Sequence, residues 1–293
     1  MRAFEYHAPT QLDEAVETLH QHGAAARALA GGTDLVVQMK EGATRFPSPS
    51  HLISLKLVSQ LQGIDFGEED GLRIGAAVTM AEVSESPLIR QRFPAVAEGA
   101  GVVGSFQTMN MATVGGNLCN AAPSADIAPP LLVYEAEAVI VGPQGRRSLP
   151  LEEFFLGPGH TALMPDELLV EVRVPTPSAR SGSAYARHTP RKQMDIAVVG
   201  VGVVLTLSDG GTIEKARVAL GAVAPTPVRS RAAEAILEGQ AVSEELFSRA
   251  AKVAASESKP ISDTRGSADF RSHLVQVLTE RMIRTAIARA TNG

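Results

Sequence analysis

Apolar residues recur at helical spacing at the start of the chain and then give way to short uninterrupted runs. Residues 10–23 predict a helix, because their apolar positions fall on one face. Those positions are Leu12, Ala15, Val16 and Leu19. Thr10 and Asp13 resemble a capping box at its beginning. The runs at 27–30 and 51–55 predict buried strands.

Strands and short helices alternate through the middle of the chain, over residues 56–176. Runs rich in β-branched residues and leucine predict strands at 72–78, 138–141 and 168–174. Residues 94–103 start with a proline and predict a helix. This segment therefore mixes both element types around one core.

A segment of prolines and small polar residues, 175–183, interrupts the pattern. Its two prolines exclude a helix interior and a central strand. We therefore expect a first domain at 1–176, with α/β subdomains at about 1–55 and 56–176, and a second domain at 177–293.

The second domain is predicted to begin with long strands and to end with helices. Residues 196–207 and 213–223 predict an antiparallel hairpin around the turn Asp209-Gly210-Gly211. Helices are expected at 230–237, 243–256 and 268–290. The order of these elements indicates an α+β protein.

Two glycine-paired turns are the strongest candidates for chemistry. They are Gly31-Gly32-Thr33-Asp34 and Thr113-Val114-Gly115-Gly116-Asn117. Glycine reaches positive φ freely, and exposed main-chain N–H groups beside a helix start favour anions. Two such turns predict a clamp on a long ligand with a diphosphate, such as a flavin dinucleotide. Each turn alone is also compatible with a strand-to-helix connection that needs glycine for geometry only.

Side chains beside the turns extend this candidate site. Thr33 can add a hydroxyl donor, whereas Asp34 suits a helix cap, because its charge repels an anion. Asp126 suits a pair of ribose or ribityl hydroxyls, and it could equally cap a helix that begins near Ile127. Asn117 and Asn120 are ligand contacts or turn formers.

Composition excludes several classes of function. The 293 residues carry a net charge of −5 without a basic stripe, so we expect no nucleic-acid partner. No apolar run is long enough to span a bilayer and the chain starts without a signal-peptide pattern, so a cytoplasmic location without membrane insertion is expected. The Gly-x-Gly-x-x-Gly and phosphate-loop signatures are missing, which argues against Rossmann and P-loop folds.

Other reactive residues are interpreted as structural. Cys119, the single cysteine, excludes an internal disulfide and an all-cysteine metal site, and it is expected to be a small buried side chain. His20 and His22 point apart on a helix, so a metal site made by that pair is not expected. Three arginines, Arg281, Arg284 and Arg289, are expected to complement the last helix's end and solvated face.

Taken in order along the chain, these residues resemble the medium, FAD-binding subunit of the xanthine dehydrogenase and carbon monoxide dehydrogenase family of molybdenum hydroxylases. The motifs run through Phe4-Glu5-Tyr6, 30–35, Gln107, 113–117, Ser124-Ala125-Asp126, Tyr185-Ala186-Arg187 and 191–197. The resemblance covers essentially the whole chain.

The resemblance implies a FAD-binding fold of the vanillyl-alcohol oxidase and MurB type, followed by a smaller C-terminal domain. It implies that residues 30–34 and 113–117 embrace the diphosphate, and that Leu169 and Arg187 lie near the flavin ring or the adenine. The implied FAD contacts are Leu29, Ala30, Gly31, Gly32, Thr33, Asp34, Leu35, Thr113, Gly115, Gly116, Asn117, Asn120, Asp126, Leu169 and Arg187. Arg187 has a second interpretation as part of a solvated basic loop with His188, Arg191 and Lys192.

Two differences from particular members of this family limit which of them the chain can resemble. Carbon monoxide dehydrogenase flavoproteins often carry His-Ser where this chain has Thr33-Asp34, which weakens a carbon monoxide assignment. A variant with an additional iron–sulfur cluster in this subunit is excluded, because only Cys119 is present.

The implied function is electron transfer. Substrate would be oxidised in a large molybdopterin-binding subunit, and a small subunit with [2Fe-2S] clusters would relay electrons to this FAD and then to an external acceptor. A dimer of heterotrimers is the expected assembly. No residue of this chain is then needed as a catalytic acid or base. The alternatives are a stand-alone FAD-dependent oxidase or reductase and a non-catalytic nucleotide-binding module.

Overall fold

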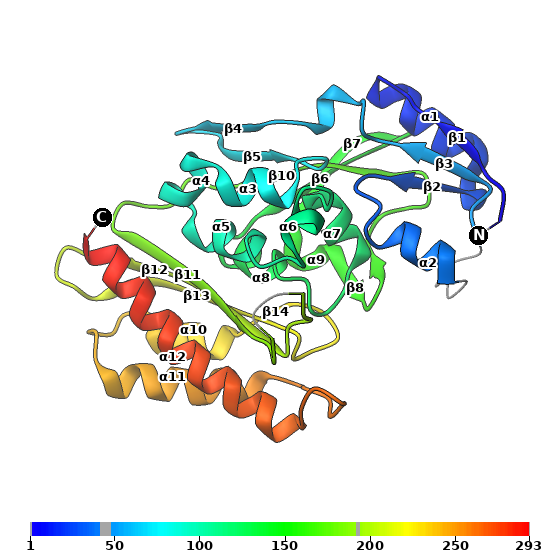
Figure 1. Ribbon diagram of the computed structural model, residues 1–293. Coiled ribbons are helices and arrows are strands. Elements are labelled where there is room, and N and C mark those ends of the chain that lie inside the picture. Colours follow the sequence, from blue (N-terminus) through cyan, green and yellow to red (C-terminus); the bar gives the residue numbers. More distant parts are fainter. Residues whose placement is uncertain (1, 42–47, 192–193, 293) are drawn as a thin grey trace.

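Three larger sheets, a two-stranded sheet and their helices form stacked layers in the computed structural model, which describes residues 2–41, 48–191 and 194–292. In Figure 1 a sheet at the top is separated by helices from a second large sheet, and the C-terminal helices lie beneath that one. Two residues of the predicted motifs, Lys192 and Gln193, lie outside the described ranges.

The first subdomain is a small parallel sheet with order β1-β3-β2. Its elements are β1 (Glu5–His7), α1 (Leu12–His22), η1 (Gly23–Ala25), β2 (Ala26–Leu29), α2 (Leu35–Glu41) and β3 (His51–Ser54). The predicted apolar face of α1 packs on Ala26 and Ile53. The predicted capping box is wrong: Gln11 precedes the helix, and Thr10 N–H donates to the Glu14 carboxylate at 3.1 Å.

The second subdomain is a five-stranded antiparallel sheet with order β4-β5-β10-β6-β7. Its strands are β4 (Ile64–Gly67), β5 (Gly71–Gly75), β6 (Glu137–Gly142), β7 (Gly145–Pro150) and β10 (Leu168–Val174), with η2 (Ser59–Leu61) before them and the small pair β8 (Phe155–Gly157) and β9 (His160–Thr161) beside them. The three predicted strands are its inner members. Sequence pattern missed β4 and β7 because edge strands show little continuous apolar character.

Short helices connect the strands and fill one side of this sheet. They are α3 (Met80–Glu85), α4 (Pro87–Arg92), α5 (Pro94–Ala100), α6 (Phe106–Met109), α7 (Val114–Asn120), α8 (Ala128–Val133) and α9 (Leu151–Phe154). Phe93, Phe154 and Leu118 are fully buried in the core that they form with the sheet. The helices hold the second glycine turn, at the start of α7, against the first subdomain.

The C-terminal domain is a four-stranded antiparallel sheet with order β11-β12-β13-β14. Its elements are β11 (Ser181–His188), β12 (Val199–Leu207), β13 (Ile213–Gly221), β14 (Val228–Arg229), α10 (Arg231–Leu237), α11 (Glu244–Glu257) and α12 (Ala268–Asn292). The hairpin and the helices were expected. The strand β11 begins inside the proline-rich segment and lies at the sheet edge, where the nearby prolines are tolerated.

Helix α12 packs closely on the edge of this sheet. A Cβ on Gly182 of β11 would lie 2.0 Å from the carbonyl oxygen of Ala286, so only glycine permits the approach. On the other face, Gly202 and Gly221 leave room for Pro129 of α8. The sheet is therefore enclosed between the helices of the two domains (Figure 1).

An ion cluster around Glu135, just after α8, ties the two domains together. Its carboxylate accepts hydrogen bonds from Lys215 at 2.5 Å, Arg217 at 2.8 Å and Arg229 at 3.0 Å. Desolvation acts to raise the pKa of Glu135, but these hydrogen bonds outweigh it and lower the pKa to about 2.

We expect Glu135→Gln to lower the melting temperature at pH 7. The loss should be roughly 1 kcal/mol, about 2–4 °C, because water screens a carboxylate that is about one-third exposed. The folded pKa is depressed, so this contribution exists above pH 4.5 and disappears as the pH falls toward 2. Thermal denaturation against pH measures it. Glu152→Gln, at an exposed pair with Arg231, is the matched control and should change little.

Candidate functional site

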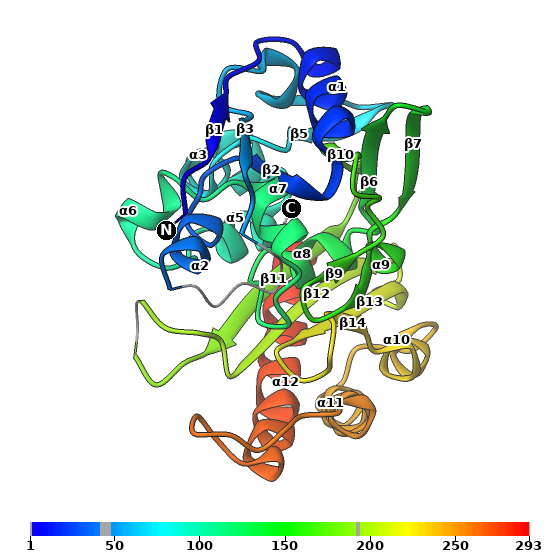
Figure 2. The same cartoon turned by 90° about the vertical axis from the view of Figure 1, so that its right-hand side faces the viewer.

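The two glycine turns lie in contact, although about eighty residues separate them. A Cβ built on Gly31, just after β2, would lie 1.8 Å from the carbonyl oxygen of Met111. A Cβ on Gly116 would lie 3.9 Å from that of Ala30. Figures 1 and 2 both place β2 beside α7. The fold thus brings the two predicted motifs to one place.

The first turn offers main-chain donors. Within the described residues, the N–H groups of Gly31, Gly32 and Thr33 have no hydrogen-bond acceptor in the protein. Gly32 has φ of 74°, the left-handed conformation that points successive N–H groups toward one side. Leu29 ends β2 and Leu35 begins α2, so the turn joins strand to helix as predicted. This arrangement suits a phosphate.

The second turn is different, because its donors are already used. Val114 N–H donates to Val78 at 2.9 Å, and Gly115 N–H donates to Ala76 at 2.8 Å. The N–H groups of Gly116 and Asn117 donate to the hydroxyl and carbonyl oxygens of Thr113. The expectation that both turns expose main-chain donors is therefore wrong for the second turn. Its glycines serve close packing, since a Cβ on Gly115 would lie 2.6 Å from that of Ala76.

The second motif contributes side chains instead. The Oδ1 atom of Asn117 is buried and has no hydrogen-bond partner among the residues that the structure describes. Asn120 ends α7, and Ala121 follows it with a left-handed φ of 45°, which turns the chain toward Asp126. A buried polar atom without a partner costs free energy unless a ligand or water satisfies it.

Asp126 is the centre of a buried network. Its carboxylate accepts from the Tyr185 hydroxyl at 2.7 Å and from Arg187 Nη1 at 2.5 Å. The Asp126 and Arg187 side chains are only 7% and 6% exposed. Because Arg187 is buried, its alternative interpretation as part of a solvated basic loop is wrong. The capping alternative for Asp126 is also wrong, since Ile127 precedes α8 and Asp126 makes no cap.

Arg187 keeps one donor unused. Its Nη2 atom is buried and has no acceptor within the described part of the chain. The Arg187 and Asn117 atoms are thus two unsatisfied polar groups on elements that flank the turns. Tyr185 and Arg187 are two residues apart on β11, so they share one face of the strand. The two-residue spacing of Tyr185 and Arg187 is visible in the sequence, but the hydrogen bond that Tyr185 donates to Asp126 was not anticipated.

Burial sets the ionisation of Asp126. Desolvation raises its pKa from 3.8 to about 6, against the opposing effects of Arg187 and the Tyr185 hydrogen bond. A raised folded pKa means that Asp126 favours folding below pH 3.8, and that this contribution is lost as the pH rises to about 6.

We therefore expect the stability of the FAD-free protein, relative to Asp126→Asn, to fall by about 2 kcal/mol between pH 4 and pH 7. Urea denaturation of both proteins at several pH values measures this difference. Glu167→Gln, at a carboxylate whose pKa is lowered by Arg147, is a control for which the trend has the opposite sign. A difference independent of pH would contradict the expectation.

Leu169 comes from the sheet rather than from either glycine turn. It is on β10, where its side chain is 4% exposed and packs in the core that also contains Val114 and Leu118 of α7. A β-bulge follows directly, between Leu169 and Glu171. The structure thus places Leu169 beneath α7 rather than beside the first turn.

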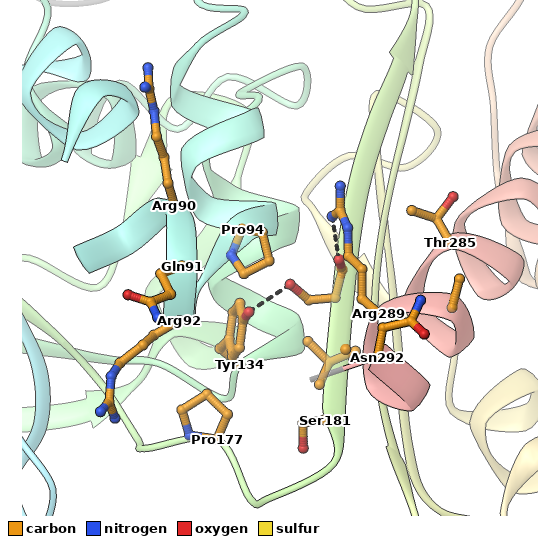
Figure 3. A pocket seen from close by; sticks show the side chains of 14 residues that line it. Arg90, Gln91, Arg92, Pro94, Tyr134, Pro177, Ser181, Thr285, Arg289 and Asn292 are labelled. Carbon is orange, nitrogen blue, oxygen red and sulfur yellow. Dashed lines mark hydrogen bonds between the residues drawn. The ribbon is translucent and has the colours of Figure 1, made fainter. Parts of the chain in front are cut away.

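A cavity of about 630 Å³ lies at the domain boundary, and none of the predicted FAD contacts lines it. Figure 3 shows Arg289 and Tyr134 among the side chains that line it. Arg289 donates to the Ser183 carbonyl oxygen and to Glu98, both at 2.6 Å. Arg289 lies in the last turn of α12, as expected, and its bond to Glu98 also links the two domains, which was not anticipated.

The remaining reactive residues behave mostly as expected. Burial raises the pKa of the Cys119 thiol to about 12, so it stays protonated at neutral pH and is no nucleophile. His20 and His22 point apart: His20 bonds to Asp166 at 2.8 Å, whereas His22 stacks on His51. No helix within the described ranges is both long and apolar enough to cross a membrane.

Two sequence families match the chain. Residues 2–177 match the FAD-binding domain of molybdopterin dehydrogenases, and residues 184–286 match the C-terminal domain of carbon monoxide dehydrogenase flavoproteins. The unmatched residues between them fall in the proline-rich segment.

Individual proteins are similar over nearly the full length. The carbon monoxide dehydrogenase medium chain of Hydrogenophaga pseudoflava is 37% identical, covering 98% of both chains. A putative xanthine dehydrogenase FAD-binding subunit of Escherichia coli K12 is 35% identical, covering 97% of this chain and 96% of that one. Among solved structures, carbon monoxide dehydrogenase of H. pseudoflava superposes with a TM-score of 0.92 at 38% identity, covering 98% of both chains. Quinoline 2-oxidoreductase of Pseudomonas putida 86 superposes with a TM-score of 0.91 at 30% identity, covering 99% of this chain and 98% of that one.

Proposed function

Because the chain belongs to the family of FAD-binding subunits of the molybdenum hydroxylases, we propose that it relays electrons within such an enzyme. It accepts them from the [2Fe-2S] clusters of a small partner subunit and delivers them to an external acceptor. Substrate is oxidised in a large molybdopterin-binding partner. The assembly is a dimer of heterotrimers in the cytoplasm.

The first glycine turn carries this proposal. Its three main-chain donors, which have no acceptor among the described residues, suit the FAD diphosphate, and Thr33 adds a hydroxyl beside them. The second turn supports the cofactor by packing: Gly115 allows α7 to approach Ala76, and Asn117 offers a buried amide oxygen. The remaining predicted contacts, including Asn120 and Leu169, stay proposals.

Arg187 and Asp126 set the charge around the cofactor. Arg187 keeps an unused donor, and at neutral pH Asp126 is mainly ionised and holds the guanidinium in place. When bound, FAD supplies the chemistry that exchanges electrons in pairs or singly. The protein binds it, orients it and favours a negative charge close to Arg187.

Purification of the native assembly through a tag on this chain tests the proposal. We expect stoichiometric FAD together with molybdenum and iron, measured by flavin absorbance and mass spectrometry. Under anaerobic conditions, substrate should bleach the flavin absorbance only when the partner subunits are present. FAD-free protein, or the absence of molybdenum and iron partners, would refute the proposal. Substrate turnover by the isolated chain would support the stand-alone oxidase or reductase instead.

A further inference from the structure

Three histidines gather at the end of α1, away from the glycine turns. His7 ends β1, His22 ends α1 and His51 begins β3. His7 Nε2 lies 3.1 Å from His51 Nδ1, and the His22 ring stacks on the His51 ring with centroids 3.7 Å apart. One ring nitrogen from each histidine lies within 4.8 Å of the other two.

The sheet and the helix fix where these side chains start. Strands β1 and β3 are parallel, with Glu5 opposite His51, so Glu5, His7 and His51 share one face of the sheet. Helix α1 covers that face, because its buried residues pack against Ile53 of β3. Its last residue, His22, therefore ends at the edge where the other two histidines lie. Figure 1 shows β1, β3 and α1 close together at the N-terminal end of the molecule.

The spacing matches a transition-metal site. Two nitrogens bound to one tetrahedral Zn²⁺ at about 2.0–2.1 Å are about 3.3 Å apart, close to the 3.1 Å between His7 and His51. The His22 nitrogen lies within 4.8 Å of the other two, so ligation requires this half-buried side chain to move closer. Glu5 Oε2 lies 3.4 Å from His51 Nδ1, and its side chain is 74% exposed. It can therefore provide a fourth ligand.

We propose that His7, His22 and His51 bind a divalent transition metal ion, with Glu5 or a water molecule as the fourth ligand. Imidazole ligands with one carboxylate suit Zn²⁺, Ni²⁺ and Cu²⁺ better than Mg²⁺ or Ca²⁺. The ion joins β1, α1 and β3, three segments that are otherwise held by a three-stranded sheet. This site is independent of the proposed electron transfer: on β2, Ala26 pairs with His51, whereas the glycine turn follows Leu29 at the other end.

Titration of the full chain, without a histidine tag and freed of metal by a chelator that is then removed, tests the site. Calorimetry with ZnCl₂ should show one ion bound per chain. His22→Ala and His51→Ala should each weaken binding at least about tenfold. His20→Ala is the matched control, because His20 lies on the same helix but bonds to Asp166, and it should bind like the unmodified chain.

Two further measurements separate ligation from simple packing. Co²⁺ should give the intense visible absorption of tetrahedral coordination in the unmodified chain and in His20→Ala, and lose it in His22→Gln. Saturating Zn²⁺ should raise the melting temperature of the same two proteins only. If Zn²⁺ binding is absent, or equal in His20→Ala and His22→Ala, the histidines only stack and hydrogen-bond, and the proposal is overturned. Melting curves without metal verify that each variant is folded.

Discussion

Replacing Gly31 by alanine is expected to abolish stoichiometric FAD binding and to cost about 3 kcal/mol of stability. The new Cβ would lie 1.8 Å from the Met111 carbonyl oxygen, and carbon atoms in real structures do not approach within 3.0 Å. Because the obstructing atom is backbone, no side-chain rotation relieves the clash. Either the turn or residues 111–112 must move, and the three donors of the turn move with them.

The measurements are flavin released per chain and the melting temperature, which should fall by about 6–12 °C. Gly157→Ala is the matched control: its Cβ has no neighbour within 4 Å and its φ is not left-handed. It should keep both FAD and stability. Gly32→Ala should fall between the two, because a left-handed residue with a Cβ costs about 1–2 kcal/mol. Full FAD occupancy in Gly31→Ala would show that this turn does not hold the cofactor.

Replacing Arg187 by methionine is expected to destabilise the FAD-free protein by about 3–5 kcal/mol. The change leaves the Asp126 carboxylate buried with only the Tyr185 hydroxyl as partner, and a buried charge without its counter-charge is costly. The double variant Arg187→Met with Asp126→Asn should recover most of the loss, because it removes both charges. Urea denaturation at pH 7 measures all three proteins.

Arg231→Met is the matched control, because its partner Glu152 and Arg231 itself are exposed, and exposed pairs contribute about 0–1 kcal/mol. In the FAD-loaded protein, Arg187→Met should also lower the flavin reduction potential, since a nearby positive charge favours the reduced, anionic flavin. Arg187→Lys keeps that charge, so its flavin reduction potential should stay closer to that of the unmodified protein than the potential of Arg187→Met does. An unchanged potential in Arg187→Met would place this arginine away from the flavin ring.

Much of the architecture could be predicted from the sequence. The helical face of α1, the inner strands β5, β6 and β10, and the hairpin β12–β13 all show in the period of their apolar residues. That periodic signal is local, because residues on the same face of a helix or strand are close in sequence. Edge strand β7 shows no such period of apolar residues, since most of its residues are exposed to water on both faces.

The candidate site was predicted only in part. Glycine pairs mark both turns, but whether a main-chain N–H is free depends on acceptors elsewhere in the fold. The carbonyl oxygens of Ala76 and Val78 accept hydrogen bonds from the N–H groups of the second turn. The sequence around residue 114 gives no sign of these acceptors. The same holds for Arg289, whose partner Glu98 is 191 residues away.

The sequence by itself determined the order of elements, the two glycine turns and the resemblance to FAD-binding subunits, because these depend on local pattern and on motif order. Only the tertiary structure decided which donors of the turns are available, that Asp126 pairs with Arg187, and that His7, His22 and His51 meet. The physical reason is that pairing, burial and desolvation belong to contacts between distant segments, and folding alone brings those segments together.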